Sequence, residues 1–174
     1  MNSSPPLLAE INALGRAGFV ARLGGVFEHS PWIAERAWAA RPFTSVAALH
    51  AAMTRAMRDG RDAEKLALIR AHPELAGREA KEKKLTADSR SEQASAGLDR
   101  LADADARKFA ELNAAYRAKF GFPFVIAVRA RTQDQILAEC ARRFERGEAE
   151  EHATALAEVE TIARIRLERM FGAA

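Results

Sequence analysis

The chain has 174 residues, of which 48% are hydrophobic and 29% charged, so it can build one domain with a sizeable core and is too apolar for a disordered protein. Its 27 basic and 24 acidic residues are interleaved and give a net charge of +3, which argues against a nucleic-acid partner. Cys140 is the only cysteine, which excludes an intrachain disulfide and a cysteine-based zinc cluster. A chain without disulfides suits a reducing compartment, so we expect a cytoplasmic protein.

The termini and the apolar stretches give no sign of membrane attachment. No stretch approaches the roughly 18 continuous apolar residues of a membrane span, and the N-terminus lacks the features of a secretion signal. We expect residues 1–6 to be flexible. Because no repeat, linker or composition shift marks a boundary, the sequence predicts a single domain over 1–174.

Helical periodicity and capping signals predict an all-α bundle of eight to nine helices. In chain order we expect helices over 7–14, 16–22, 31–40, from a cap at Thr44 or Ser45 to 57, from 62 to just before 72, from Asp88 or Ser89 to about 101, from 103 to just before 121, 133–144 and 148–171. We expect the charged link over 77–84 to be exposed.

One short extended segment interrupts the helices near Phe122–Val128. Its β-branched and aromatic residues favour a strand, but Pro123 disfavours an inner one. Such an apolar segment is core by default. Its backbone N–H and C=O groups lack partners within the segment, however, and a planar polar ligand could bind them.

His72 is the first candidate for chemistry because Pro73 follows it. Proline disfavours the α region for the residue before it, so the preceding helix should stop at His72 and hold the histidine in place. A histidine can give or take a proton near neutral pH. The alternative is a structural histidine favoured by the negative end of the helix dipole.

Ser89, Glu92 and Gln93 follow at helical spacing. Residues at i, i+3 and i+4 share one helix face, so a hydroxyl, a carboxylate and an amide can point the same way. The alternative is a capping box, because Ser-x-x-Glu also starts helices. The two interpretations are compatible, since a helix N-terminus favours anionic ligands.

Arg166 falls in the middle of the apolar arc of the last expected helix, at about 100° per residue. A guanidinium aimed inward needs an anionic or bidentate partner, because an unpaired buried charge is very costly. Arg166 is therefore expected either to form a buried salt bridge, to extend its charge to the surface, or to bind a carboxylate or carbonyl of a ligand.

Several common catalytic motifs are missing from the sequence. It contains no His-Glu-x-x-His, phosphate-binding loop, dinucleotide glycine pattern or Gly-x-Ser-x-Gly. This removes the usual support for metallopeptidase, nucleotide-binding and α/β-hydrolase functions. A different class stays open, namely a non-enzymatic helical interaction module that binds an anionic partner, which a steep salt dependence of binding would reveal.

Taken together, these segments resemble the OHCU decarboxylase family, whose members act on 2-oxo-4-hydroxy-4-carboxy-5-ureidoimidazoline on the way from urate to (S)-allantoin. The resemblance runs from Phe19 to Leu167 and rests on the motifs at 25–32, 72–77, 89–93, 96–98, 120–126 and 166–167. One departure is Ala130, where the resemblance leads us to expect a glycine in a turn.

The resemblance implies an all-α decarboxylase that needs no metal or cofactor, acts on a small ureidoimidazoline carboxylate and works as a homodimer. His72 then matches the catalytic histidine, and Glu92 its acidic partner. The substrate-binding positions are matched by Pro73, Ser89, Gln93, Arg166 and the backbone of Phe124, Val125, Ile126, Ala127 and Val128. Because all of these residues are present, a relative that kept the fold and lost the activity is disfavoured.

Overall fold

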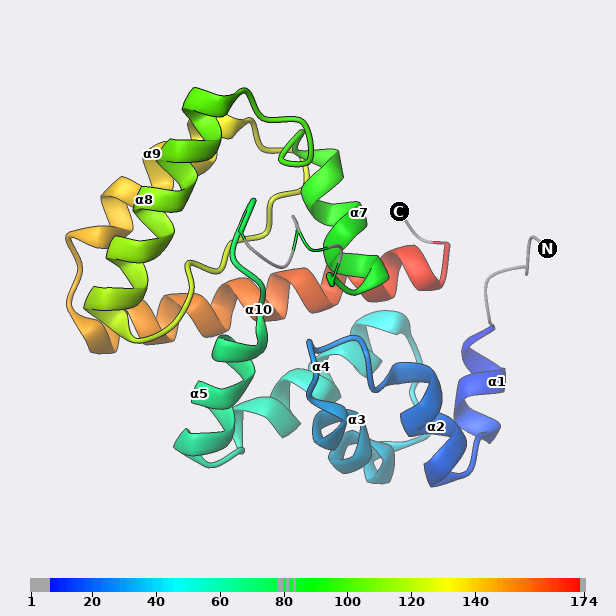
Figure 1. Ribbon diagram of the computed structural model, residues 1–174. Helices are drawn as coiled ribbons and strands as arrows, with labels where there is room; N and C mark the ends of the chain where they lie inside the picture. The colour runs from blue at the N-terminus through cyan, green and yellow to red at the C-terminus, as the bar shows by residue number, and fades with distance from the viewer. Residues whose placement is uncertain (1–6, 78–79, 81, 83, 173–174) are drawn as a thin grey trace. The chain divides into compact units, whose positions relative to one another are not determined.

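The computed structural model describes residues 7–77, 80, 82 and 84–172 (Figure 1). The expected flexible residues 1–6 lie outside this range, as do four residues of the link over 77–84. Within the described residues, nine α-helices and one 3₁₀-helix have defined bounds, and none of these residues belongs to a β-strand. The all-α prediction is confirmed.

The chain divides into two compact units. One contains the described residues up to Leu68 and those from Glu160 onward, and the other is Ile69–Val159. Two helices contribute to both units, namely α5 (Asp62–Ala71) and α10 (Glu148–Met170). Within the described ranges, no helix is both long and apolar enough to cross a membrane.

The first unit is built on helices α1 (Leu8–Ala13), α2 (Arg16–Leu23), α3 (Pro31–Ala37) and α4 (Val46–Arg58), with a 3₁₀-helix at Trp38–Ala40. α3 packs against both α2 and α4. Leu49, Met53 and Met57 recur every four residues along α4 and are fully buried, which is the pattern of a core-facing stripe. The helical stretch expected over 31–40 is present, with an α-helix over Pro31–Ala37 and a final 3₁₀ turn over Trp38–Ala40.

The second unit contains α7 (Ala87–Ser95), α8 (Asp103–Phe120) and α9 (Gln133–Phe144), and α8 packs against α9. Aromatic rings from α8, α9 and the connection between them form one cluster around Tyr116. α8 ends at Gly121, whose φ of 73° is a left-handed conformation that glycine adopts without strain. The chain then crosses to α9 as an extended trace (Figure 1).

The N-terminus of α7 differs from the prediction. The helix starts at Ala87, and the Thr86 hydroxyl accepts the cap hydrogen bond from the Ser89 N–H over 3.2 Å. The capping-box interpretation of Ser89 and Glu92 is therefore wrong, because Thr86 precedes Ser89 and takes the cap position. The helix also ends at Ser95 and not near Leu101, because the chain turns through Gly97 at a φ of 71°.

Candidate functional site

His72 lies where α5 ends, in the second unit. Its backbone N–H donates to the Ile69 carbonyl over 3.2 Å, and Pro73 prevents a further helical turn. The His72 residue is only 6% exposed. The prediction that the helix stops at this histidine is confirmed, and the residue is buried at the helix end.

The turn after His72 is clamped by the carboxamide of Gln93 from α7. Gln93 Oε1 accepts from the Ala76 N–H over 2.9 Å, and Nε2 donates to the Glu74 carbonyl over 3.3 Å. Ala76 has a φ of 50°, which is costly for a residue with a Cβ, so the clamp holds a strained backbone. Gly77 is required beside it, because a Cβ there would lie 2.6 Å from the Glu74 Cβ.

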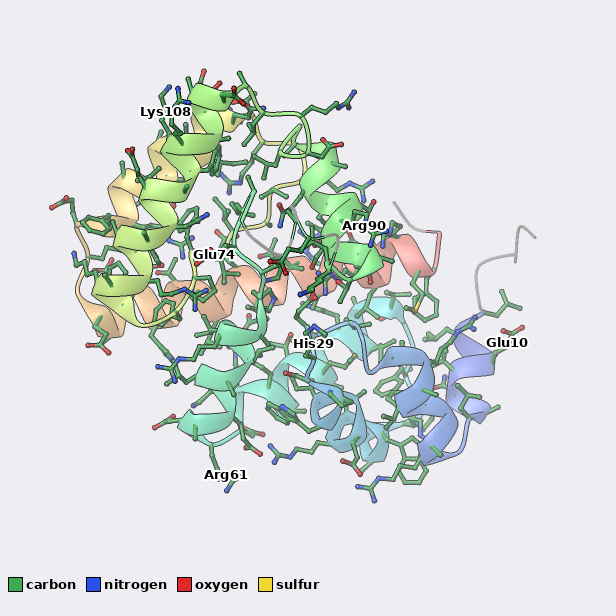
Figure 2. The ribbon with its side chains drawn as sticks, in the orientation of Figure 1. Glu10, His29, Arg61, Glu74, Arg90 and Lys108 are labelled. Atoms are coloured by element: carbon green, nitrogen blue, oxygen red, sulfur yellow. The ribbon has the colours of Figure 1, made fainter. Side chains whose placement is uncertain are left out.

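α8 holds the same turn from a second direction. Asn113 Nδ2 donates to the Leu75 carbonyl over 2.9 Å. Arg117 Nε donates to Glu74 Oε1 over 2.8 Å, and Figure 2 shows Glu74 on the turn beside α8. The sequence reasoning missed both the Asn113 contact and the structural use of Gln93, because each joins segments that are not neighbours in the sequence.

The three predicted polar residues of α7 do not share one environment. Ser89 and Gln93, one helical turn apart, are both 4% exposed, whereas Glu92 is half-buried. The structure thus brings α7 and the His72 turn together through Gln93. A pocket of about 680 Å³ opens beside α7, with Arg90 (Figure 2), Gln93 and Asp99 as polar groups on a mostly apolar wall.

The predicted substrate-binding backbone from Phe124 to Val128 is buried throughout. Arg143 Nη1 donates to the Val125 carbonyl over 2.9 Å. The Ala127 N–H donates to Glu158 Oε2 over 2.9 Å, and the Ala127 carbonyl accepts from Arg131 Nε over 3.0 Å. Charged side chains therefore take up backbone groups that this irregular segment cannot pair internally.

Arg143 is itself part of a buried charged network. Its guanidinium and the Glu151 carboxylate are fully buried and joined by several hydrogen bonds, including one of 3.0 Å from Nε to Oε1. Burial opposes the charge of Arg143, but the hydrogen bonds and charge of Glu151 outweigh it and raise the arginine pKa. The Tyr116 hydroxyl also donates to Glu151, and burial together with this bond raises the tyrosine pKa.

Arg166 belongs to the first unit, where it is 3% exposed as its helical position predicted. Its Nη1 donates to Glu28 Oε2 over 2.8 Å and to the Val26 carbonyl over 3.3 Å. Of the expected alternatives, the buried salt bridge is present. Glu28 lies in the motif at 25–32, but nothing in the sequence indicated that it would pair with a residue 138 positions away.

Across the part of the chain that the structure describes, no group of three or more His, Cys, Asp or Glu side chains could hold a metal ion.

The chain is similar to known proteins along almost its whole length. Residues 12–168 match the family model described as OHCU decarboxylase. A protein of Haloferax volcanii named 2-oxo-4-hydroxy-4-carboxy-5-ureidoimidazoline decarboxylase is 46% identical over 164 residues, which are 94% of this chain and 95% of the relative.

Two solved structures have a similar fold. A crystal structure of (S)-allantoin synthase matches with a TM-score of 0.74 and 29% identity, covering 95% of this chain and 54% of that one. A crystal structure of OHCU decarboxylase in the presence of (S)-allantoin matches with a TM-score of 0.66 and 25% identity, covering 80% of this chain and 90% of that one. The matched range and the identity to curated relatives show that this chain belongs to the OHCU decarboxylase family, a family of carboxy-lyases.

Proposed function

We propose that this chain decarboxylates 2-oxo-4-hydroxy-4-carboxy-5-ureidoimidazoline to (S)-allantoin in urate degradation, without a cofactor. Support comes from the family match over 12–168 and from the name of the relative that is 46% identical. The similar structure determined in the presence of (S)-allantoin supports the assigned product.

The observation that carries the proposal is the fixed, buried position of His72. A stereospecific proton transfer needs an acid or base whose position does not vary, because a displaced donor could reach both faces of the ring. His72 meets this requirement, since Pro73 ends its helix and Gln93 binds the following turn through Ala76 and Glu74.

The substrate's own structure explains how the reaction can run without a cofactor. Its ring carbon carries a carboxylate and a hydroxyl and neighbours a C=N bond. When the bond to the carboxylate breaks, CO₂ leaves and the electron pair moves toward that C=N bond. The nitrogen of that C=N bond takes up a proton, the hydroxyl loses its proton and becomes a carbonyl, and the neighbouring carbon gains a proton. One proton is consumed in total, and one face of the ring is selected.

We assign the proton transfers to His72 with Glu92 as its acidic partner. The pair removes the hydroxyl proton and delivers a proton to the neighbouring carbon. Imidazole suits both steps, because its usual pKa of about 6.5 lets it act as acid and base near neutral pH.

The remaining predicted residues hold the substrate. Arg166 and Ser89 bind the ring carbonyl and ureido groups, together with Pro73 and the backbone of Phe124–Val128. Gln93 also binds the substrate, through the N–H donor and the oxygen lone pair that are not used to bind the turn. A carboxamide has two N–H donors and two acceptor lone pairs. The turn uses one donor and one lone pair.

A coupled assay tests the function. Urate oxidase and hydroxyisourate hydrolase generate the short-lived substrate from urate, and circular dichroism then follows the appearance of (S)-allantoin. We expect a fast signal of one sign when the chain is added. A slow, racemic appearance at the rate of the reaction without the chain would contradict the proposal.

Three further properties belong to the same proposal: the chain forms a homodimer, it acts in the cytoplasm, and its two units unfold together as one domain. Sedimentation equilibrium, cell fractionation and the coincidence of unfolding transitions measured by two probes test them in turn. A monomer at assay concentration, a secreted protein or two separate transitions would each contradict the corresponding statement.

A further inference from the structure

Side chains bind the backbone of the segment Phe124–Val128 at Val125 and Ala127, and the Val128 carbonyl accepts from the Arg131 N–H over 3.0 Å. In an extended chain the N–H and C=O of one residue point to the same edge, and those of the next residue point to the opposite edge. Val125 and Ala127 are two residues apart and therefore share an edge. The side chains that bind them are Arg143 of α9, Glu158 of α10 and Arg131.

Ile126 lies between these two anchored residues and belongs to the opposite edge. It is 3% exposed, and its backbone N–H and C=O have no hydrogen-bond partner among the described residues. Buried backbone groups are paired in most proteins, because leaving one without a hydrogen bond is costly. A donor and an acceptor side by side match the N–H and C=O of a ureido group or a cyclic amide.

We propose that Glu158 and Arg143 are positioning residues for the substrate. By binding the Ala127 N–H and the Val125 carbonyl, they turn the backbone of Ile126 toward the amide-like groups of the ligand. This inference rests on the proposed function, which supplies a ligand of that chemistry. Neither side chain takes part in the proton transfers, so they act on substrate binding and not on the chemical step.

Glu158 gives the cleaner test of the two. Arg143 is fully buried in an ion pair, so its replacement endangers the fold, whereas Glu158 is only half-buried. Glu158→Ala removes the acceptor for the Ala127 N–H. Glu158→Gln keeps an oxygen at the same place. Glu150→Ala is the matched control, because Glu150 is an exposed carboxylate of the same helix that pairs with Arg146 over 3.0 Å.

The decarboxylase assay separates binding from chemistry. We expect Glu158→Ala to raise KM about tenfold with kcat within about twofold of wild type, as for the loss of one hydrogen bond that orders a binding group. Glu158→Gln should restore most of the affinity, and Glu150→Ala should match wild type. A wild-type KM in Glu158→Ala, or a fall in kcat with KM unchanged, would overturn the inference.

Amide hydrogen exchange tests the anchor without the reaction. In the ligand-free protein, the Ala127 amide should exchange at least about tenfold faster in Glu158→Ala than in wild type or Glu158→Gln, because its acceptor is gone. Unchanged exchange would also overturn the inference. An inactive wild-type chain would instead refute the proposed function, while the exchange comparison would still test the anchor.

Discussion

The second unit contains two buried stretches of irregular backbone, and they are held by different chemistry. The turn from His72 to Gly77 is bound by the neutral carboxamides of Gln93 and Asn113. The segment Phe124–Val128 is bound by ionised side chains, Arg143 and Glu158 among them.

The use of neutral groups at one stretch and charged groups at the other has different electrostatic consequences. A neutral carboxamide brings no charge near His72, to which we assign the proton transfers, and burying it costs less than burying an ion. Charged hydrogen bonds are stronger, but a buried charge needs a counter-charge, which Glu151 provides for Arg143. The backbone of the histidine turn is thus bound by neutral groups, and the Arg117–Glu74 ion pair beside it is partly exposed, whereas the segment Phe124–Val128 depends on a fully buried ion pair.

The largest effect is expected at the histidine itself. His72→Asn removes the imidazole that we propose transfers the protons but keeps a polar side chain of similar size, so kcat should fall by about 10²–10⁴-fold in the coupled assay. The far-UV circular dichroism spectrum and the melting temperature should stay close to those of wild type. A folded His72→Asn protein with wild-type activity would exclude His72 from the chemistry.

Replacing Arg143 tests the charged contacts of the segment Phe124–Val128. Arg143→Met leaves the Glu151 carboxylate buried without its main counter-charge, which should cost about 3–5 kcal/mol of unfolding free energy, measured by urea denaturation. The double variant Arg143→Met, Glu151→Leu should be more stable than the single one, because no lone charge stays buried. A double variant less stable than Arg143→Met would show that the charge balance is not what matters.

Replacing Gln93 tests the neutral contacts of the turn from His72 to Gly77. Gln93→Leu leaves the Ala76 N–H and the Glu74 carbonyl without their clamp, which should cost about 1–3 kcal/mol and lower decarboxylase activity by loosening the His72 turn. Gln133→Leu is the matched control, because Gln133 donates to the Gly97 carbonyl of another turn over 3.2 Å. The control should lose stability but keep activity, and equal activity losses in both would count against the clamp.

The smallest effect compares two alanines in left-handed conformations, one at each stretch. Ala130, at a φ of 62°, is exposed just after the segment, so Ala130→Gly should raise stability by about 0.5–1 kcal/mol. Ala76, at a φ of 50°, is buried in the turn, so Ala76→Gly should gain less because it also loses a packed methyl group. If backbone strain were unimportant, thermal denaturation would show that both substitutions lower stability.

The sequence predicted the features that depend on neighbouring residues. Pro73 stops a helix at His72 in the structure as in the sequence, and the helical angle of Arg166 predicted its burial. The expected departure at Ala130 also falls on a turn with positive φ. Local rules sufficed here, because proline sterics and helical periodicity act over only a few residues.

Features that depend on distant contacts could not be predicted in the same way. Gln93 binds a turn 17 residues earlier, and Glu28 binds an arginine 138 residues later. Even one local feature failed, because Thr86 and Ser89 are both good N-caps and the pattern Ser-x-x-Glu favoured the wrong one. The single-domain organisation, the site roles and the homodimer remain predictions.

The most direct test of the central claim is the enantiomeric purity of the allantoin that the chain forms from urate-derived substrate, measured by chiral chromatography immediately after complete conversion. A histidine fixed by Pro73 and Gln93 predicts almost pure (S)-allantoin with the wild-type chain and a racemic product, formed at least about 10²-fold more slowly, with His72→Asn. A racemic product from the wild-type chain, or pure (S)-allantoin at the wild-type rate from His72→Asn, would contradict it.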